Sequence, residues 1–393
     1  MNIMKTIEII FWVLLGIVFY TYLGYGIVLF VLLQIKRIFK KKKQIQLSDD
    51  ELPEVTLLVA AYNEEDFVQK KIENTLSLNY PQHKLHQMWC TDGSDDQTPN
   101  ILANYTDIEV LHKPERAGKI AAMNRAVKYV KTPIVIFSDA NTLLGKESIR
   151  KIAEMFHDPK TGCVSGEKRI FNAESEAASA AGEGLYWKYE STLKRWDAEL
   201  YSAVGAAGEL FAIRTALFNE VEPDTLLDDF IISLRVAMQG YKIDYDPEAY
   251  AIETASANVK EELKRKIRIA AGGIQSVVRL YPLLNIFRYG LLSFQYISHR
   301  VLRWTITPLA LLFLLLTNII LAPNSEFYLV FLSLQLIFYI AAILGWILEN
   351  KKLKVKLLFV PYYFFIMNYA VFMGFGRYIK KTQSVNWERA KRG

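Results

Sequence analysis

The stretch VTLLVAAYNEE at residues 55–65 joins an apolar, β-rich run to a polar ending, which is typical of a buried strand that stops at a loop. Similar runs and amphipathic helical patterns alternate after it: strands at 86–90, 108–112 and 133–138, and helices at 64–78, 117–130 and 146–157. Alternation of this kind predicts an α/β domain, with a mainly parallel sheet covered by helices on both faces. We expect residues 44–273 to form this domain.

Polar side chains follow three of the predicted strands, at the point where each strand ends. These endings are Tyr62-Asn63-Glu64, Thr91-Asp92-Gly93-Ser94 and Asp139-Ala140-Asn141. Asp and Asn also favour turns for local reasons, so one such ending alone would say little. Ligands of parallel sheets bind beyond the carboxyl ends of the strands, however, and three polar endings together therefore predict a binding site there.

Several classes of enzyme are excluded by what the sequence lacks. It has no Walker loop and no G-x-G-x-x-G after a strand, so a P-loop or nicotinamide enzyme is not expected. Its two cysteines, Cys90 and Cys163, are too few for a disulfide framework and are expected to be buried small hydrophobes. The net charge is +6, and the basic residues cluster beside apolar segments, which favours a membrane flank over a nucleic-acid partner.

Carboxylates remain as the candidate chemistry: Asp92, Asp139 and the pair Asp228-Asp229 in LLDDF. Oxygen ligands at a sheet edge suit Mg²⁺ or Mn²⁺ held together with substrate phosphates. Lys119 adds positive charge for a diphosphate. A metal ion and a lysine can stabilise a departing diphosphate, and a separate carboxylate can take a proton from an attacking hydroxyl. This set of residues predicts a nucleotide-sugar site.

The N-terminal part of the chain predicts a membrane anchor. Residues 9–35 carry no charge and exceed the roughly 20 residues that cross a bilayer. Lys36, Arg37 and the run Lys40 to Lys43 follow at once. By the positive-inside rule this end of the helix faces the cytoplasm, so residues 1–43 are expected to form a transmembrane helix with a basic flank.

The C-terminal part adds further membrane segments. Residues 274–304 are apolar but interrupted by arginines, which predicts helices lying in the membrane interface. Residues 305–393 form the last membrane region, with two expected spans at 305–321 and 327–348. A third apolar stretch follows at 357–378. For this stretch we favour a re-entrant or interfacial course, because such a course keeps the basic tail in the cytoplasm. We expect a multi-pass protein of the cell (inner) membrane whose catalytic domain is cytoplasmic.

The middle of the chain, roughly residues 53–280, resembles glycosyltransferase family 2, with its GT-A fold for nucleotide-diphospho-sugars. Its membrane branch, which includes the cellulose, hyaluronan and poly-N-acetylglucosamine synthases, is the most similar. AAYNEE (60–65), TDGSDDQT (91–98), RAGKIAAMNRA (116–126) and DAN (139–141) resemble consecutive motifs of that family. The resemblance implies roles for the following residues: Tyr62, Glu64 and Asp92 at the uracil, Lys119 at the diphosphate, and Asp139 and Asn141 at the metal ion.

The second half of the domain continues the resemblance, with departures. The family's acceptor-pocket loop is similar to GAAGELFAIR (205–214), and its T-E-D motif is similar to LDDF (227–230). The Q-x-x-R-W region of the family is matched in part by RKIRIAAGGIQ (265–275). The resemblance implies the following roles: Asp229 as catalytic base, with Asp228 in place of the family's glutamate; Arg268 at the diphosphate; and Gly208, Glu209 and Gln275 at the acceptor. Four positions depart from the family pattern: Thr91, Asn141, Arg265 and Ile269.

Taken together, these observations predict an inverting, membrane-bound glycosyltransferase of the hexosyltransferase type. Its expected donor is a nucleotide sugar, UDP-linked, and its acceptor a polysaccharide or lipid-linked saccharide. Because Ile269 offers no aromatic face for a sugar, single addition and polymerisation both stay open. The altered motifs also leave a second class open, a non-catalytic subunit or scaffold of a polysaccharide synthesis or export complex.

Overall fold

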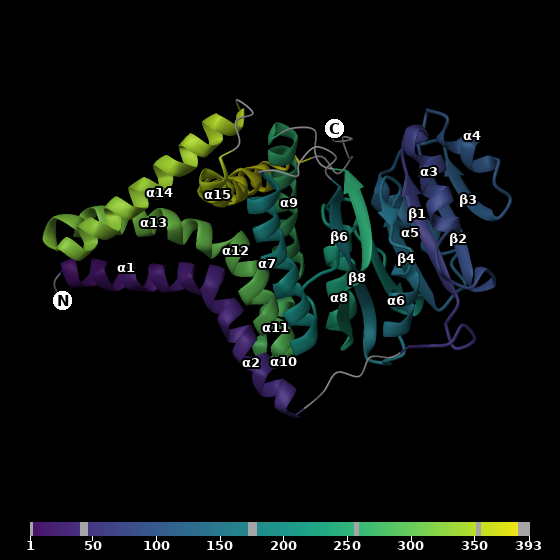
Figure 1. Ribbon diagram of the computed structural model, residues 1–393, viewed down its shortest axis with the longest axis horizontal. Coiled ribbons are helices and arrows are strands. Elements are labelled where there is room, and N and C mark those ends of the chain that lie inside the picture. The colour runs from purple at the N-terminus through teal and green to yellow at the C-terminus, as the bar shows by residue number, and fades with distance from the viewer. Residues whose placement is uncertain (1–2, 40–45, 172–178, 255–258, 351–354, 384–393) are drawn as a thin grey trace.

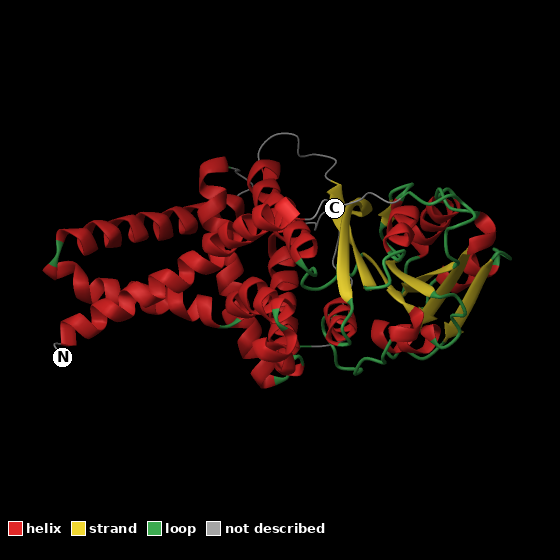
Figure 2. Ribbon diagram, turned by 90° about the horizontal axis from the view of Figure 1, so that it is seen from below, coloured by secondary structure: helices red, strands yellow, loops and turns green. Residues whose placement is uncertain are grey.

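The computed structural model describes residues 3–39, 46–171, 179–254, 259–350 and 355–383. All the described strands lie together in one part of the molecule, and the other part is helical (Figure 2). The N-terminal and C-terminal thirds of the chain meet in the helical part, so segments far apart in sequence form one bundle (Figure 1). The division of the chain into a central α/β domain and apolar ends agrees with the sequence analysis.

The centre of the sheet is parallel, as predicted. Strand β1 (Val55–Ala61) lies between β2 (Leu85–Asp92) and β4 (Ile134–Asp139), and β3 (Ile108–Lys113) lies outside β2. Ala61 pairs with Thr91, and Ala60 pairs with Asp139, so the carboxyl ends of these strands are level with one another. The register therefore brings the three polar endings to one edge of the sheet.

The remaining strands make the sheet mixed. Strand β7 (Leu210–Arg214) runs antiparallel to β4 and to β6 (Thr161–Phe171), while β6 is parallel to β8 (Lys242–Thr254). The short β5 (Leu143–Leu144) closes the order β3-β2-β1-β4-β7-β6-β8-β5. This second half was not resolved into strands from the sequence.

Helices cover both faces of the sheet: α3 (Glu65–Leu76), α4 (Thr98–Ala103), α5 (Lys119–Val127), α6 (Ser148–Met155) and α8 (Asp228–Met238). The three expected helices are present and shorter than predicted. Alternate residues of β1 enter different cores, since Leu57 and Leu58 belong to the clusters on opposite faces. Cys90 and Cys163 are fully buried in one of these cores, as expected for small hydrophobes.

The N-terminal apolar segment is one long, bent helix. It comprises α1 (Ile3–Phe19), a π-helical turn (Tyr20–Gly24) and α2 (Tyr25–Phe39). Figure 1 shows α1 running with the bundle and α2 turning away from it. The part of the predicted span that follows the bend packs on α7 (Ser179–Leu200) of the central domain. Leu29 and Leu33 of α2 are buried there with Leu193 of α7.

The basic end of α2 is bound to the central domain as well. Lys36 donates to the backbone carbonyls of Glu199 and Leu200, and Arg37 makes two hydrogen bonds to the Glu199 carboxylate. In the structure, these two cations of the expected basic flank are bound by acceptors of the central domain. The run Lys40 to Lys43 and the tail from residue 384 onward lie outside the described residues.

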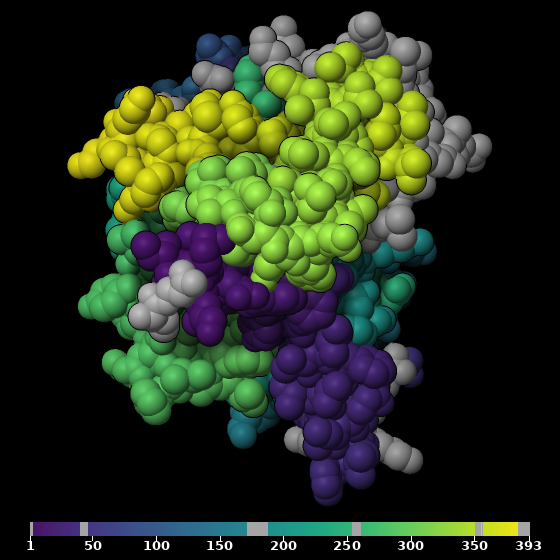
Figure 3. Space-filling view, turned by 90° about the vertical axis from the view of Figure 1, so that its left-hand side faces the viewer, coloured from purple at the N-terminus to yellow at the C-terminus, as the bar shows by residue number. Residues whose placement is uncertain are grey.

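Four helices in the described part of the chain are long and apolar enough to cross a membrane: Ile3–Phe39, Ile306–Asn324, Glu326–Glu349 and Leu357–Lys380. They include α13 (Ile306–Leu321), α14 (Glu326–Asn350) and α15 (Lys356–Lys380). Helices α1, α13 and α14 run along one another, whereas α15 lies across their direction (Figures 1 and 3). Helix α15 is one continuous helix and not a re-entrant hairpin.

Residues 259–304 join the sheet domain to the bundle through a chain of helices: α9 (Val259–Arg279), α10 (Ile286–Tyr289), α11 (Leu291–Tyr296), a second π-helical turn (Ile297–Val301) and α12 (Leu302–Trp304). Ion pairs fix three of the arginines in this region to the central domain. Arg279 binds Asp224, and Arg300 and Arg303 both bind Glu190.

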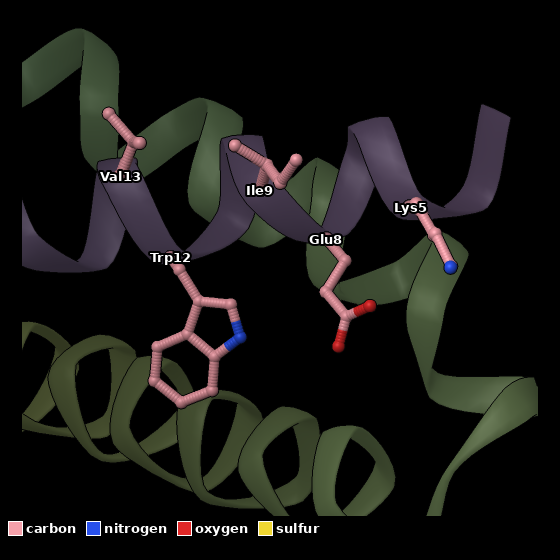
Figure 4. Close-up of a pocket in the computed structure, with 5 residues that line it drawn as sticks. All are labelled: Lys5, Glu8, Ile9, Trp12 and Val13. Carbon is pink, nitrogen blue, oxygen red and sulfur yellow. The ribbon is translucent and has the colours of Figure 1, made fainter. Parts of the chain in front are cut away.

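A groove lies along the N-terminal part of α1. It has a volume of about 520 Å³ and is lined by Lys5, Glu8, Ile9, Trp12 and Val13 (Figure 4). Glu8 also accepts a hydrogen bond from the Tyr328 hydroxyl, at 2.8 Å. Because these residues lie at the end of α1 remote from the sheet (Figure 1), the groove is not part of the site at the strand ends.

Candidate active site

The polar ending of β2 is shaped by backbone donors. Asp92 is buried at the end of the strand, and one carboxylate oxygen accepts hydrogen bonds from the backbone N–H groups of Ala117 (2.9 Å) and Gly118 (2.5 Å). Its other oxygen is buried and has no hydrogen-bond partner in the part of the chain that the structure describes. A buried oxygen without a partner is costly, so it is a ready acceptor for a ligand donor.

Tyr62, after β1, lies beside an arginine that the sequence analysis did not single out. The Arg116 guanidinium carbon is 3.8 Å from the centroid of the Tyr62 ring, and its Nη1 donates to the Tyr62 hydroxyl at 3.2 Å. Gly93, with φ +69°, makes this approach possible, because a Cβ there would lie 2.6 Å from the Arg116 Cβ. The two residues form a flat cation–aromatic pair next to Asp92.

The Tyr62–Glu64 turn is attached to the loop after β2. Asn63 has a φ of +52° and its side-chain amide donates to Asp95 at 2.6 Å. The Glu64 backbone N–H donates to the Thr98 hydroxyl at 2.8 Å, and Glu64 itself is buried. The first two strand endings therefore form one connected edge, which holds the predicted residues Tyr62, Glu64 and Asp92.

Lys119 begins α5 and joins the other strand ending to α8. Its Nζ is 2.7 Å from Asp139 Oδ1 and 3.6 Å from Asp228 Oδ2. Burial alone would lower the pKa of Lys119, but the Asp139 and Asp228 carboxylates outweigh it and the pKa is raised. Burial raises the pKa of Asp139, against the opposing effect of Lys119. At neutral pH the lysine is therefore a firmly charged cation at this edge.

The residues that could hold a divalent cation are few. Asn141 Oδ1 is buried and has no hydrogen-bond partner within the described residues, and Asp139 lies in the same turn. Among the described residues, no three or more His, Cys, Asp or Glu side chains form a group that could hold a metal ion. These two oxygen donors fit a hard cation such as Mg²⁺ or Mn²⁺ only if water and substrate phosphates supply the other ligands.

Asp229 lies in the first turn of α8, where the Gly205–Glu209 loop comes close to it. A Cβ on Gly208 would lie 3.2 Å from Asp229 Oδ2, and one on Gly205 (φ +88°) would lie 2.3 Å from the Phe230 ring. Burial, followed by the neighbouring Asp228 carboxylate, raises the pKa of Asp229 to about 7. Asp229 is therefore suited to accept a proton near neutral pH.

Ser233, which the sequence analysis missed, connects this loop to the helix. Its hydroxyl donates to the Asp229 carbonyl at 2.6 Å and accepts from the Ala206 N–H at 3.0 Å. The contact depends on a turn of α8 meeting a loop some 27 residues earlier, for which no local sequence signal exists.

The predicted acceptor residues differ in how they are placed. Glu209 pairs with Lys168, which also pairs with Glu253, and this pairing lowers the pKa of Glu209 to about 2, against the opposing effect of burial. The Gln275 side chain is occupied by backbone, since it accepts from the Leu226 N–H at 2.9 Å and donates to the Asp224 carbonyl at 2.8 Å. Gln275 thus holds the loop that leads into Asp228 and Asp229.

Arg268 and Arg265 both lie on α9. Burial lowers the pKa of Arg268, while the nearby carboxylates of Asp228, Asp229 and Asp139 act against this. Arg268 therefore shares the electrostatic environment of these three carboxylates. Arg265 instead forms an ion pair with Glu262 at 3.2 Å and lies 3.9 Å from Glu253.

A second residue that the sequence analysis missed lies beneath the Asp139 turn. Lys71 of α3 is fully buried, and its ammonium donates to the hydroxyls of Ser138 (2.8 Å) and Thr142 (3.3 Å). Burial lowers the pKa of Lys71 to about 7, although the Asp139 carboxylate opposes the shift. The lysine binds both ends of the turn that carries Asp139 and Asn141. A lysine on an amphipathic helix is usually exposed, so the pattern did not indicate it.

The fold is similar to that of a solved glycosyltransferase. The mannosyltransferase PcManGT from Pyrobaculum calidifontis, solved in complex with GDP-Man and Mn²⁺, superposes with a TM-score of 0.69 at 20% identity, covering 95% of this chain and 100% of that one. The mixed sheet with its polar strand ends is thus a GT-A fold, the class predicted above. Residues 53–272 match the family described as "Glycosyltransferase like family 2". The chain belongs to this family and is a glycosyltransferase.

Curated relatives lie in the same family. A poly-beta-1,6-N-acetyl-D-glucosamine synthase of Staphylococcus aureus (strain MSSA476) is 27% identical over 252 residues, which are 61% of this chain and 60% of that protein's length. The synthase of the same name from Staphylococcus epidermidis (strain ATCC 35984) is 24% identical over 385 residues, covering 90% of this chain and 91% of the relative.

Proposed function

We propose that the protein is an inverting glycosyltransferase that moves a sugar from a UDP-linked donor to a saccharide acceptor, at a site on the cytoplasmic side of the cell membrane. The observation that carries this proposal is the meeting of Lys119, Asp139 and Asp228 at one sheet edge, with Asp229 next in the chain. A polysaccharide or lipid-linked saccharide as acceptor is supported by the likeness to the staphylococcal synthases.

The two connected strand endings would hold the nucleobase. The unpartnered Asp92 oxygen can accept an N–H of the base, and the Tyr62–Arg116 pair offers a flat surface for stacking. Lys119 and Arg268 would bind the diphosphate. A divalent cation held by Asp139 and Asn141 would supply further charge neutralisation there.

Asp229 would take the proton from the acceptor hydroxyl as that oxygen attacks the anomeric carbon. The C–O bond to the acceptor forms on the face opposite the breaking bond to the diphosphate, which inverts the anomeric centre. Gly208 leaves room for the acceptor beside the carboxylate. Gln275 would act at the acceptor side by fixing the Asp224–Leu226 loop.

The proposal is tested with purified full-length protein in lipid nanodiscs and a panel of UDP- and GDP-sugars, with nucleoside diphosphate release as the readout. We expect one UDP-sugar to be turned over in the presence of Mg²⁺ or Mn²⁺. Gel analysis of radiolabelled product then separates polymerisation from single addition. Folded protein that releases diphosphate from none of the donors would favour a non-catalytic scaffold instead.

We expect the rate to rise with pH through about 7. Asp229 must be deprotonated to act as base, and its pKa is raised to about 7, so below that pH most molecules carry the inactive, protonated form. The value of kcat/KM should fall about tenfold per pH unit below the midpoint and level off above it. Asp228→Asn removes a negative neighbour and should move the midpoint to lower pH. A midpoint unchanged in Asp228→Asn would contradict the assignment.

We expect a chelator to stop transfer and added Mn²⁺ or Mg²⁺ to restore it. The melting temperature of the ligand-free protein should stay the same with and without chelator, because Asp139 and Asn141 alone bind a free cation weakly. With nucleoside diphosphate present, the ion should raise the melting temperature. Full transfer activity in excess chelator would contradict the metal assignment.

A further inference from the structure

Lys71 of α3 is a charged residue in an apolar place. It is fully buried. Val68 and Ile72 of the same helix are buried as well, in a core that includes Ile136 of β4. Lysine is almost never fully buried, because taking its ammonium group out of water is costly unless the group is hydrogen-bonded or paired. A methionine would fill much the same space without this cost. The lysine therefore indicates a role that an apolar side chain cannot fill.

The hydrogen bonds of Lys71 form two chains that run away from the ammonium group. An ammonium group only donates, so the hydroxyls of Ser138 (2.8 Å) and Thr142 (3.3 Å) both accept from it. Each hydroxyl then has one hydrogen to donate. The Thr142 hydroxyl donates to the Asp139 carbonyl at 2.9 Å. The Ser138 hydroxyl has its shortest acceptor in the Glu209 carbonyl, at 3.2 Å. Lys71 therefore orients both hydroxyls, and hydrogen bonds in such chains strengthen one another.

The two chains end on different sides of the candidate active site. The chain through Thr142 ends on the backbone of Asp139, in the turn that also carries Asn141. The chain through Ser138 ends on the backbone of Glu209, the last residue of the Gly205–Glu209 loop, which lies against Asp229. One buried lysine therefore connects the turn of the expected cation ligands to the loop beside the expected base.

Helix α3 also holds the chain just after this turn. The Asn74 side chain donates to the Leu144 carbonyl at 2.9 Å and accepts from the Leu144 N–H at 2.7 Å. Ser138 and Thr142, which Lys71 binds, flank the turn on its two sides. The placement of the Asp139–Asn141 turn is therefore set by α3, and Lys71 is the residue of α3 that lies nearest to it in these contacts.

Exact placement of the turn matters because the expected cation site has few protein ligands. Asp139 and Asn141 are the two oxygen donors assigned to it, and a neutral amide holds a hard cation more weakly than a carboxylate does. Residues that orient the ligands of a metal ion typically change its affinity by about 10- to 100-fold when they are lost. A residue that fixes this turn should therefore control how tightly the cation is held.

We propose that Lys71 is a positioning residue, which keeps the Asp139–Asn141 turn in the form that binds the divalent cation and keeps the Gly205–Glu209 loop in register with it. Lys71 acts through the hydroxyls of Ser138 and Thr142 and not by contact with the substrates. The inference rests on the proposed function in one respect, which is that Asp139 and Asn141 are the ligands of the cation.

The test measures Mn²⁺ binding in the presence of UDP by electron paramagnetic resonance, with purified full-length protein in lipid nanodiscs. Lys71→Met removes the donors and keeps the length of the side chain. Thr142→Val leaves the lysine in place and breaks one of the two chains, so it tests the same path through a smaller change. Thr75→Val is the matched control, because Thr75 is a buried residue of the same helix whose hydroxyl donates to Gln87 of β2, at 2.8 Å.

We expect Lys71→Met to raise the Kd of Mn²⁺ about tenfold, and Thr142→Val to raise it about threefold. The double variant should bind Mn²⁺ no more weakly than Lys71→Met alone, because both changes break the same chain. Thr75→Val should bind Mn²⁺ as the wild type does. Saturating Mn²⁺ should restore most of the transfer rate of Lys71→Met, which a general loss of folded protein would not allow.

The outcomes separate this inference from the proposed function. Equal Mn²⁺ affinity in Lys71→Met and the wild type would overturn the positioning role and leave the proposed function standing. Weakening by Thr75→Val as large as that by Lys71→Met would also overturn the positioning role, because it would reflect altered packing of α3. A wild type that binds no Mn²⁺ with UDP present would overturn the metal assignment, and the positioning role with it.

Discussion

Asp229→Asn should lower kcat by about 10³-fold and leave the affinity for UDP close to that of the wild type, because the variant loses the proton acceptor but keeps the size of the side chain. The carboxylate lies against Gly208 in the first turn of α8, and other residues are proposed to hold the base and the diphosphate, so we expect UDP affinity to change little. Turnover is measured by diphosphate release and affinity by titration with UDP.

Asp107→Asn, on an exposed loop of the same domain, is the matched control and should retain full activity. Thermal unfolding of both variants would show that the fold is intact. Transfer by Asp229→Asn at the wild-type rate would exclude this residue as the base, whatever the remaining geometry.

Lys119→Met should lower kcat by about 10²- to 10³-fold and, unlike Asp229→Asn, also weaken UDP binding, since it removes a cation that stabilises the departing diphosphate. The Lys119 ammonium is 2.7 Å from the Asp139 carboxylate and 3.6 Å from that of Asp228. Its loss also removes the cation that lies between the carboxylates of Asp139 and Asp228.

Lys128→Met provides the matched control, because Lys128 follows the same helix and pairs with Glu220 at the surface. Its loss should change neither activity nor UDP affinity, as exposed pairs contribute little. Lys119→Arg should recover part of the activity. Wild-type kinetics and UDP affinity in Lys119→Met would refute the diphosphate role.

The strand endings could be predicted from the sequence because parallel strands in register place consecutive carboxyl ends together. Val55 to Ala61 form β1 as predicted, and Asp92 and Asp139 end their strands. Asp228 and Asp229, picked out from the sequence as a pair of carboxylates, form the first turn of α8. These features depend on short stretches of chain, whose patterns carry the information locally.

The rest of the site depends on contacts between distant segments. Lys71 meets Ser138 and Thr142 across some 70 residues, and Gln275 meets the Asp224–Leu226 loop across about 50. The polarity and periodicity of a sequence indicate whether a residue suits the surface or the core. They do not indicate which distant residue it contacts. The bend in the N-terminal helix could not be predicted for the same reason: residues 9–35 have the composition of one span, and the packing of α2 on α7 depends on residues far away in the chain.

The account rests on one donor occupying one edge of the sheet, and the structure of Asp229→Asn in nanodiscs with Mn²⁺ and a UDP-sugar that the wild type turns over would test this directly. We predict the base beside Asp92 and Tyr62, the diphosphate at Lys119, and the anomeric carbon facing residue 229. Nucleotide bound in any other part of the molecule, or a sugar pointing away from α8, would contradict the account.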